Sequence, residues 1–353
     1  MKTIKFLGLF FTVVMLINCS KDDDTSYPLP SPDPDPVVYV VGGENNGTHY
    51  VATLWKDGVS QALTDGSQDA HASSVAVVGE DVYVTGVQNN GTNNVAMLWK
   101  NGVAHPLTDG THHAAAFSVA VAGDDFYVVG SEHNGTHNLA ALWKNGVKQP
   151  LSDRDSKAYS VVVSDDTIYI AGTEWSDSAH VPVAMLWNLP ANNTGSIMAQ
   201  QLSDGSQFAA GYTVAVSGED VYVAGCEARL GNDVATIWKN GTAQALAEPT
   251  NFSVVESILA VGQDLYATGS INDGTNSVAM LWKNGEAQPL PAIDDTQKTW
   301  GRSVAVTGKD VYVAGIESTD TATVSMLWKN GVAHPLTDGT RHYFALSVAV
   351  ILQ

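Results

Sequence analysis

A tryptophan that closes a short apolar run recurs seven times in this chain. Successive copies lie 44 residues apart, except for an interval of 51 residues before Trp238 and one of 46 residues before Trp328. A period of this length is typical of β-propellers and related arrays, in which each repeat needs its neighbours to cover its apolar faces. The repeat therefore constrains the architecture before any single residue is considered. The seven tryptophans are Trp55, Trp99, Trp143, Trp187, Trp238, Trp282 and Trp328.

Each copy of the repeat contains four short runs rich in Val, Tyr, Leu and Trp, separated by clusters of Gly, Asn or Asp. In the second copy these runs are 74–77, 82–86, 95–99 and 103–107. β-Branched and aromatic runs of this length, bounded by turn residues, predict strands. The Asn101-Gly102 step between the last two runs indicates a type I′ hairpin turn. Because no helical period follows residue 36, we predict that each copy is a four-stranded antiparallel meander.

The two ends of the repeat region complement each other. The region opens at Val38–Gly42, which matches the second run of the repeat, and it ends at 347–350, which matches the first run. Each kind of strand occurs seven times only if the C-terminal strand joins the N-terminal blade. A linear solenoid would need distinct capping repeats, and the sequence shows none. We therefore predict an all-β, seven-bladed propeller that is closed by its C-terminal strand.

The N-terminal segment has the pattern of an exported lipoprotein. Residues 1–18 contain Lys2 and Lys5 followed by an apolar stretch, which is typical of a signal peptide and too short to span a membrane comfortably. Cys19 then ends a lipobox-like sequence, which predicts its lipidation. Residues 19–36 are interpreted as the lipidated cysteine and a semi-rigid tether rich in Pro and Asp, and residues 37–353 as the propeller.

Charge and cysteine content limit the partners of this chain. The formal net charge is −20, and loss of the two lysines of the signal peptide would make it −22. Such a charge argues against nucleic acid as a partner and against electrostatic adhesion to anionic lipid, so we expect membrane contact through the lipid anchor only. Self-repulsion favours a soluble monomer. With Cys19 lipidated, Cys226 has no disulfide partner and is expected to be a small buried hydrophobe.

Candidate binding residues are found where the copies disagree within the repeated frame. The residue directly before the Ser-Val-Ala-Val run, and the residue two positions before that one, vary between aromatic, charged and small types. We expect these positions, placed in the links between blades, to form a collar at the channel mouth that holds a sugar or a peptide. Neutral drift at exposed positions is the alternative. The candidate residues are His71, Phe117, Tyr159, Tyr212, Glu256, Trp300, Arg302 and Phe344.

Neither a metal site nor a catalytic site is predicted. None of the ten histidines has the spacing of a zinc site. Four Asp-Gly steps in the links suggest calcium but lack the Asp density of a calcium loop, so we expect no cofactor and keep calcium as an option. The chain has no Gly-x-Ser-x-Gly elbow and no phosphate-binding glycine loop. The four Asp-Gly steps begin at Asp65, Asp109, Asp204 and Asp338.

The repeated frame resembles a known group of proteins. Val-Tyr-Val-Ala-Gly, Val-Ala-Met-Leu-Trp-Lys-Asn-Gly and Leu-Thr-Asp-Gly-Thr are similar to segments of uncharacterised propeller-repeat lipoproteins of Bacteroidetes, over residues 37–353. Lys21–Asp24 resembles the surface-export signal of such lipoproteins. The resemblance implies a propeller anchored in the outer membrane and exposed at the cell surface. The motifs of WD40, kelch and sialidase propellers are missing, so activities of those families do not transfer.

These observations predict a surface-anchored lipoprotein whose propeller recognises a glycan or a protein without catalysis. The first alternative is a glycan hydrolase or lyase that uses the same face. It would need two or three carboxylates or histidines within reach of one substrate bond. The second alternative is a structural or assembly component of an envelope complex, which would need a broad exposed apolar patch.

Overall fold

The computed structural model describes residues 36–176, 180–192, 195–293, 298–318, 322–340 and 342–352. These residues belong to one compact unit, Pro36–Gln353. The expected signal peptide, Cys19 and all of the tether except Pro36 lie outside the described residues. Within the described part of the chain, no helix is long and apolar enough to cross a membrane.

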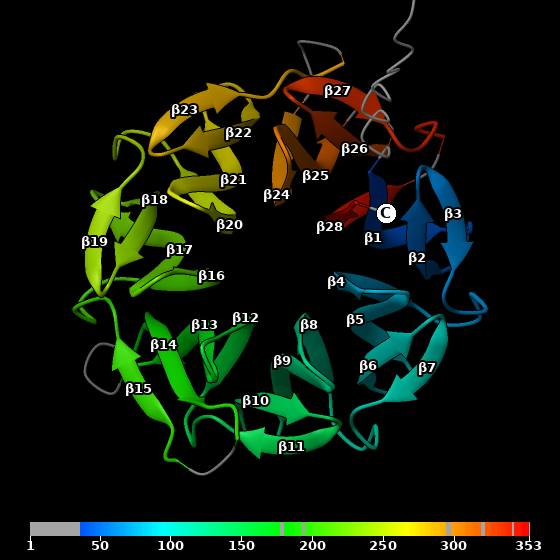
Figure 1. Ribbon diagram of the computed structural model, residues 1–353, viewed down its shortest axis with the longest axis horizontal. Coiled ribbons are helices and arrows are strands. Elements are labelled where there is room, and N and C mark those ends of the chain that lie inside the picture. Colours follow the sequence, from blue (N-terminus) through cyan, green and yellow to red (C-terminus); the bar gives the residue numbers. More distant parts are fainter. Residues whose placement is uncertain are drawn as a thin grey trace, which may run out of the picture. The chain divides into compact units, whose positions relative to one another are not determined.

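Seven four-stranded antiparallel sheets stand in a ring (Figure 1), and residues of all seven innermost strands line one central channel. The innermost strands are β4 (Ala70–Val78), β8 (Ala114–Ala122), β12 (Ser156–Ser164), β16 (Ala209–Ser217), β20 (Ser253–Val261), β24 (Lys298–Thr307) and β28 (Tyr343–Ile351). The second strands are β1 (Val37–Asn45), β5 (Asp81–Asn89), β9 (Asp125–His133), β13 (Thr167–Trp175), β17 (Asp220–Arg229), β21 (Asp264–Asn272) and β25 (Asp310–Ser318).

The third and fourth strands complete each blade towards the outside of the ring. The third strands are β2 (Tyr50–Lys56), β6 (Asn94–Lys100), β10 (Asn138–Lys144), β14 (Pro182–Pro190), β18 (Asn232–Lys239), β22 (Ser277–Lys283) and β26 (Thr323–Lys329). The outermost strands are β3 (Val59–Ala62), β7 (Val103–Pro106), β11 (Val147–Pro150), β15 (Met198–Gln201), β19 (Thr242–Ala245), β23 (Glu286–Pro289) and β27 (Val332–Pro335). We number the blades 1 to 7 from the one that contains β1. The predicted seven-bladed architecture is confirmed.

The apolar core lies between the blades rather than within any one of them. Trp99 of blade 2, for example, packs in one cluster with Tyr39 and Leu54 of blade 1. All seven repeated tryptophans are at most 2 % exposed. Since an aromatic side chain buries a large area, each tryptophan stabilises the contact between two blades.

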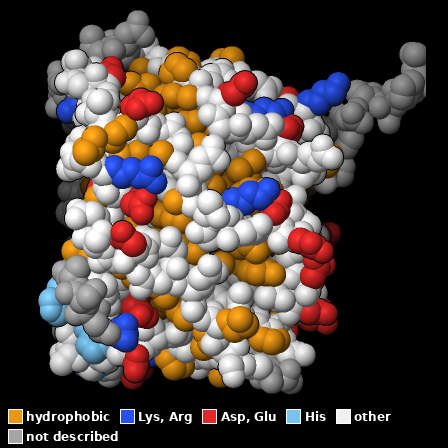
Figure 2. All heavy atoms as spheres, turned by 90° about the vertical axis from the view of Figure 1, so that its left-hand side faces the viewer, with side chains coloured by type: hydrophobic (Ala, Val, Ile, Leu, Met, Phe, Trp, Pro, Cys, Tyr) orange, Lys and Arg blue, Asp and Glu red, His pale blue; other side chains and the backbone are white. Residues whose placement is uncertain are grey.

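In five of the seven blades an Asn-Gly step follows the third strand in a tight turn. Asn101 and Gly102 have φ values of 51° and 78°, as the predicted type I′ turn requires. The Asn101 side chain accepts a hydrogen bond from the Val82 backbone N–H and donates one to Asp81, which also pairs with the Lys100 ammonium at 2.8 Å. Figure 2 shows Lys and Arg side chains beside carboxylates on one flank of the ring. Such exposed pairs contribute little stability.

The chain closes the ring through its last strand. β28 pairs antiparallel with β1, with Val348 opposite Val40, so blade 1 contains one strand from the C-terminal part of the chain and three from the N-terminal part. This confirms the predicted closure. Across the same seam, the Ser347 hydroxyl accepts a hydrogen bond from the Val75 N–H at 3.3 Å. The Val348 N–H in turn donates to the Ser303 hydroxyl at 3.2 Å.

The same hydroxyl-to-backbone bond joins every pair of neighbouring innermost strands, at distances of 3.1 to 3.4 Å. Seven such bonds therefore form an unbroken circle around the channel. The accepting side chains are Ser74, Ser118, Ser160, Thr213, Ser257, Ser303 and Ser347.

Deleting residues 345–353 removes most of β28 and opens this circle. The loss of Val348 from the core and of the pairing with β1 should lower the free energy of unfolding by at least about 3 kcal/mol. Calorimetry of residues 37–353 with and without this deletion measures the effect. Removing only 352–353, which lie beyond β28, is the matched control. An unchanged melting temperature after the larger deletion would contradict the closure.

Candidate functional site

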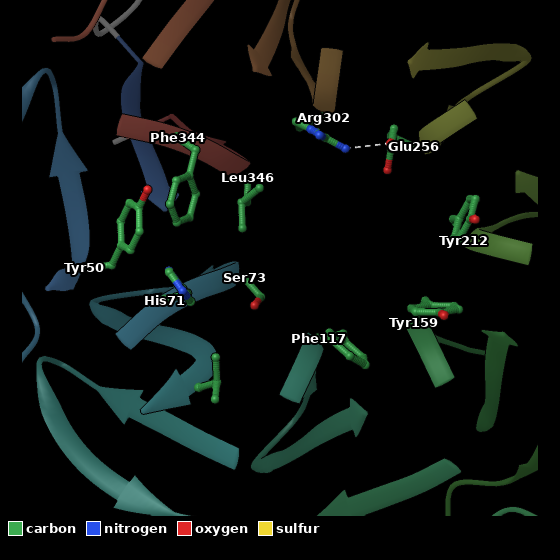
Figure 3. A pocket seen from close by; sticks show the side chains of 11 residues that line it. Tyr50, His71, Ser73, Phe117, Tyr159, Tyr212, Glu256, Arg302, Phe344 and Leu346 are labelled. Atoms are coloured by element: carbon green, nitrogen blue, oxygen red, sulfur yellow. Dashed lines mark hydrogen bonds and ion pairs between the residues drawn. The ribbon is translucent and has the colours of Figure 1, made fainter. Parts of the chain in front are cut away.

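A β-bulge lies at the same place in every innermost strand. In β12 the pairing with β13 shifts between Ala158 and Ser160, so Tyr159 is an extra residue without a partner. A bulge bends its strand and turns the extra side chain away from the regular alternation. In this ring the extra side chains are directed towards the channel (Figure 3). The seven bulged residues are Ser73, Phe117, Tyr159, Tyr212, Glu256, Arg302 and Leu346.

A glycine on the second strand makes each bulge possible. A Cβ atom on Gly130 would collide with the carbonyl oxygen of Ala115, two residues before the bulged Phe117. The same collision would occur in all seven blades, because the bulged strand approaches the second strand more closely than a side chain permits. This explains why the Val-Tyr-Val-x-Gly run ends in glycine. The seven glycines are Gly42, Gly86, Gly130, Gly172, Gly225, Gly269 and Gly315.

The seven bulged residues surround one cavity of about 620 Å³ in the channel. Its remaining wall residues are Tyr50, His71, Val87 and Phe344. Seven of the eight expected collar residues therefore line one cavity. The eighth, Trp300, is half-buried on β24 and is not among the residues that line it. The expectation that the collar belongs to the links between blades was wrong, because the residues lie within the innermost strands.

Two groups of aromatic rings form opposite parts of the cavity wall (Figure 3). Blades 3, 4 and 5 contribute an arc in which the ring centroids of Phe117 and Tyr159 are 5.4 Å apart and those of Tyr159 and Tyr212 are 5.3 Å apart. Blades 1 and 2 contribute a trio, Tyr50, His71 and Phe344, with centroid distances between 5.0 and 5.4 Å. These spacings are those of mutually packed rings, which hold one another in place.

An ion pair occupies the wall between the two aromatic groups. The Arg302 guanidinium of blade 7 donates to the Glu256 carboxylate of blade 6 at 2.6 Å, and both side chains are partly buried. The Nε–H of Arg302 is buried and has no hydrogen-bond partner among the described residues. A ligand oxygen that reached this atom would satisfy it, and an unsatisfied buried donor is costly.

Burial disfavours the charged forms of three other side chains of the wall, His71, Tyr159 and Tyr212. It lowers the pKa of His71, an effect that the nearby Asp69 carboxylate opposes. It raises the pKa of Tyr159 and, more strongly, that of Tyr212. At neutral pH the charges of Glu256 and Arg302 therefore offset each other, and the cavity wall carries no net charge.

Cys226 lies behind the arc. Its side chain packs with Ala210 and Val254 and, at 2 % exposure, is buried as predicted. Burial raises the pKa of this thiol to about 12, so it is neither ionised nor reactive at neutral pH. Tyr212 packs against the same cluster, and Cys226 is not among the residues that line the cavity.

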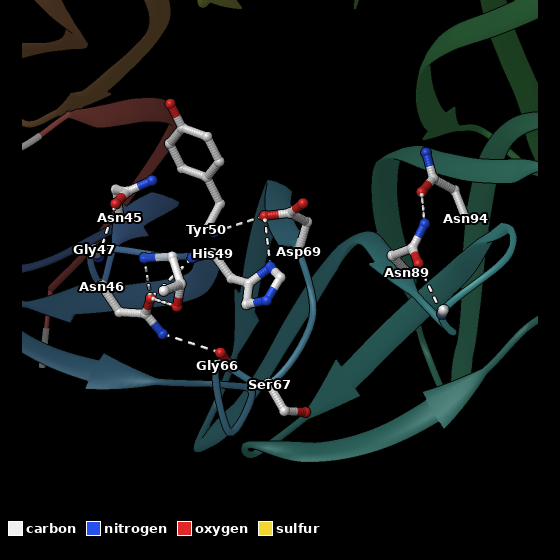
Figure 4. Close-up of polar contacts among 12 residues, drawn as sticks. Asn45, Asn46, Gly47, His49, Tyr50, Gly66, Ser67, Asp69, Asn89 and Asn94 are labelled. Carbon is white, nitrogen blue, oxygen red and sulfur yellow. Dashed lines mark hydrogen bonds and ion pairs between the residues drawn. The ribbon is translucent and has the colours of Figure 1, made fainter.

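Sequence reasoning missed Tyr50, which the preceding loop holds in place (Figure 4). The Asn46 carboxamide accepts hydrogen bonds from the backbone of Thr48 and His49. The Tyr50 backbone N–H then donates to the Asp69 carboxylate at 2.8 Å, which fixes the start of β2. A signal was present in the sequence, because Tyr50 is the only aromatic residue that opens a third strand at this register. Its counterparts are Asn94, Asn138, Pro182, Asp233, Ser277 and Thr323.

Among the described residues, no three His, Cys, Asp or Glu side chains gather as ligands for a metal ion. The Asp-Gly steps in the links form self-contained turns. In the first of them, the Asp65 carboxylate accepts hydrogen bonds from the backbone and the hydroxyl of Ser67. Asp109, Asp204 and Asp338 make the same pair of bonds to the Ser or Thr two residues later. A turn explains this pattern without an ion.

Comparisons with known proteins show the fold and no closer relationship. No protein-family model matches the chain, and no curated protein matches its sequence. The propeller domain of the Trilobed protease from Pyrococcus furiosus is similar in structure, with a TM-score of 0.54 and 14% identity over 87% of this chain and 95% of that domain. That domain is described as having an open velcro topology, whereas β28 closes the ring here.

The acylaminoacyl peptidase of Pyrococcus horikoshii is similar to the same degree, with a TM-score of 0.53 and 15% identity over 87% of this chain. This chain spans only 52% of that peptidase. At such low identity both similarities concern the β-propeller fold alone.

The raised pKa of Cys226 predicts a loss of stability at alkaline pH. The unfolded thiol ionises above about pH 8.5, whereas the folded thiol stays protonated to about pH 12, so the unfolded state gains stability as the pH rises between these values. Denaturant unfolding from pH 7 to 11 should show the decline, and it should be shallower in Cys226→Ala. Equal pH dependence of the two proteins would contradict the assigned shift.

Proposed function

We propose that this protein is a non-enzymatic, lipid-anchored surface protein whose propeller binds an uncharged sugar unit of a glycan in its central cavity. The observation that carries the proposal is the convergence of all seven bulged residues on one cavity with aromatic walls and no net charge. A volume of about 620 Å³ is within the range of small-molecule sites.

The aromatic arc suits the faces of a sugar ring. The face of an aromatic ring carries partial negative charge, and the axial C–H groups of a pyranose carry partial positive charge, so the two stack favourably. Between the arc and the trio, the Glu256 carboxylate and the Arg302 guanidinium place an acceptor and a donor side by side. Neighbouring hydroxyls of a sugar present the same alternation of donors and acceptors.

The neutrality of the wall argues against charged ligands. A free phosphate, a carboxylate or a peptide terminus would be desolvated in the cavity without a net counter-charge, which is unfavourable. We therefore favour a glycan over a protein segment as the occupant.

The wall supports binding rather than hydrolysis. Among the described residues, Glu256 is the one carboxylate that lines the central cavity, and it is engaged by Arg302. Glycoside hydrolysis commonly needs two carboxylates flanking one bond. The second alternative, a structural or assembly component, needs a broad apolar patch, and on the flank in Figure 2 apolar side chains are interspersed with polar and charged ones.

A glycan-array screen of the purified protein, with and without calcium, tests the proposal. We expect specific hits that Tyr159→Ala weakens at least about tenfold, because the variant loses the middle ring of the arc. Phe252→Ala is the matched control, since Phe252 is an exposed aromatic residue outside the cavity wall. Hits that require calcium would add an ion to the site. Binding that survives Tyr159→Ala, or no binding in either condition, would reject the proposal.

The anchor is tested separately. Cells that express the chain should incorporate labelled palmitate into it, and Cys19→Ala should abolish the label and release the protein from the membrane fraction, because the lipid is the only proposed attachment. Cys226→Ala is the control, because Cys226 is buried and should not affect labelling. Protease digestion of intact cells then reports exposure at the surface. Membrane retention of Cys19→Ala would disprove the lipoprotein assignment.

A further inference from the structure

A second, smaller cavity lies beside the central one. Its volume is about 210 Å³, and Tyr159 and Tyr212 line both cavities. It lies over blades 4 and 5, whose strands and preceding links supply its wall. The two cavities therefore adjoin each other across these two rings. The other wall residues are Asp155, Ser156, Lys157, Thr173, Trp175, Pro182, Phe208 and Ala210.

Trp175 is a departure from the repeat at this place. The Trp175 backbone N–H donates to the carbonyl oxygen of Asp155, which lies in the link before β12. In other blades the equivalent residue donates in the same way to the link before its own innermost strand. Those residues are Asn45, Asn89, His133, Ala228 and Asn272. Only blade 4 has a large aromatic side chain here, and it is 44% exposed. An exposed tryptophan on a rigid sheet, next to a cavity, has the character of a binding residue.

The neighbours of Trp175 make a platform with polar edges. Pro182 is its cross-strand partner on β14, and Phe208 comes from the link that leads into β16. Asp155 and Lys157 contribute a carboxylate and an ammonium of opposite charge to the same wall. The wall therefore resembles that of the central cavity, because both combine aromatic faces with a hydrogen-bond donor and an acceptor.

We infer that the cavity over blades 4 and 5 is a second sugar subsite, and that the ligand is a linear oligosaccharide. One terminal unit occupies the central cavity, and the adjoining units pass over the edges of Tyr159 and Tyr212 onto Trp175 and Phe208. This inference rests on the proposed function. The second cavity is smaller than an ordinary ligand site, which agrees with an extension of the central site rather than an independent one.

Calorimetric titration of the purified full-length chain tests the subsite. The probes are mono-, di-, tri- and tetrasaccharides of glucose, of mannose and of N-acetylglucosamine. For the series that binds, we expect affinity to rise about tenfold from the monosaccharide to the trisaccharide, as one further stacked ring provides. Trp175→Ala should remove this gain and leave the affinity for the monosaccharide unchanged.

Two further variants separate the subsite from a general loss of structure. Trp175→Phe keeps an aromatic ring and should restore part of the gain. Phe252→Ala removes the residue that corresponds to Phe208 in blade 6 and should change nothing, because Phe252 lines neither cavity.

The possible failures differ from one another. Equal affinity for mono- and trisaccharides in the unmodified protein would overturn the subsite and leave the proposed function standing. The same would follow if Trp175→Ala weakened every chain length equally or not at all. If no saccharide bound the unmodified protein, both the subsite and the proposed function would be overturned.

Discussion

The circle of hydrogen bonds around the channel is the constraint on which the rest of the structure depends. In each blade a Ser or Thr hydroxyl accepts the backbone N–H of the next innermost strand, and the circle is complete only when β28 has joined blade 1. Because each bond lies beside a bulge, all seven bulges are held at the same position along the channel axis. Any side chain at a bulged position is therefore presented to the same cavity.

This arrangement separates the residues that build the propeller from those that give it chemistry. The glycine opposite the bulge and the hydroxyl beside it have fixed roles, because a Cβ atom would meet a carbonyl oxygen and an apolar side chain would break the circle. The bulged residue itself pairs with nothing on the second strand. Its side chain can change without cost to the sheet, so seven positions are free to shape a binding site on an unchanged scaffold.

The site that results is asymmetric around a nearly symmetric ring. Blades 3 to 5 supply the arc, blades 6 and 7 the ion pair, and blades 1 and 2 the trio that includes Tyr50. The second cavity extends this asymmetry, because it lies beside the arc and its wall contains Trp175, a tryptophan outside the repeated set. The asymmetric wall of the central cavity and the second cavity beside it are consistent with a ligand that has a preferred direction, with one end in the channel and the other over blades 4 and 5.

The sequence by itself determined the number of blades, their strand order and their closure, because these follow from local periodicity: tryptophans for the interblade core, Asn-Gly for the hairpins and complementary ends. It also identified most of the collar, since those side chains vary within a constant frame. Only the tertiary structure decided that the collar lies on bulges within the strands, that Tyr50 belongs to it and that Trp300 does not. It also paired Glu256 with Arg302 and placed Trp175 beside Tyr159. The physical reason is that these contacts join different blades, or loops to strands, across the ring. Their geometry is set by the bulges and by the closed circle, and no spacing along the chain reports it.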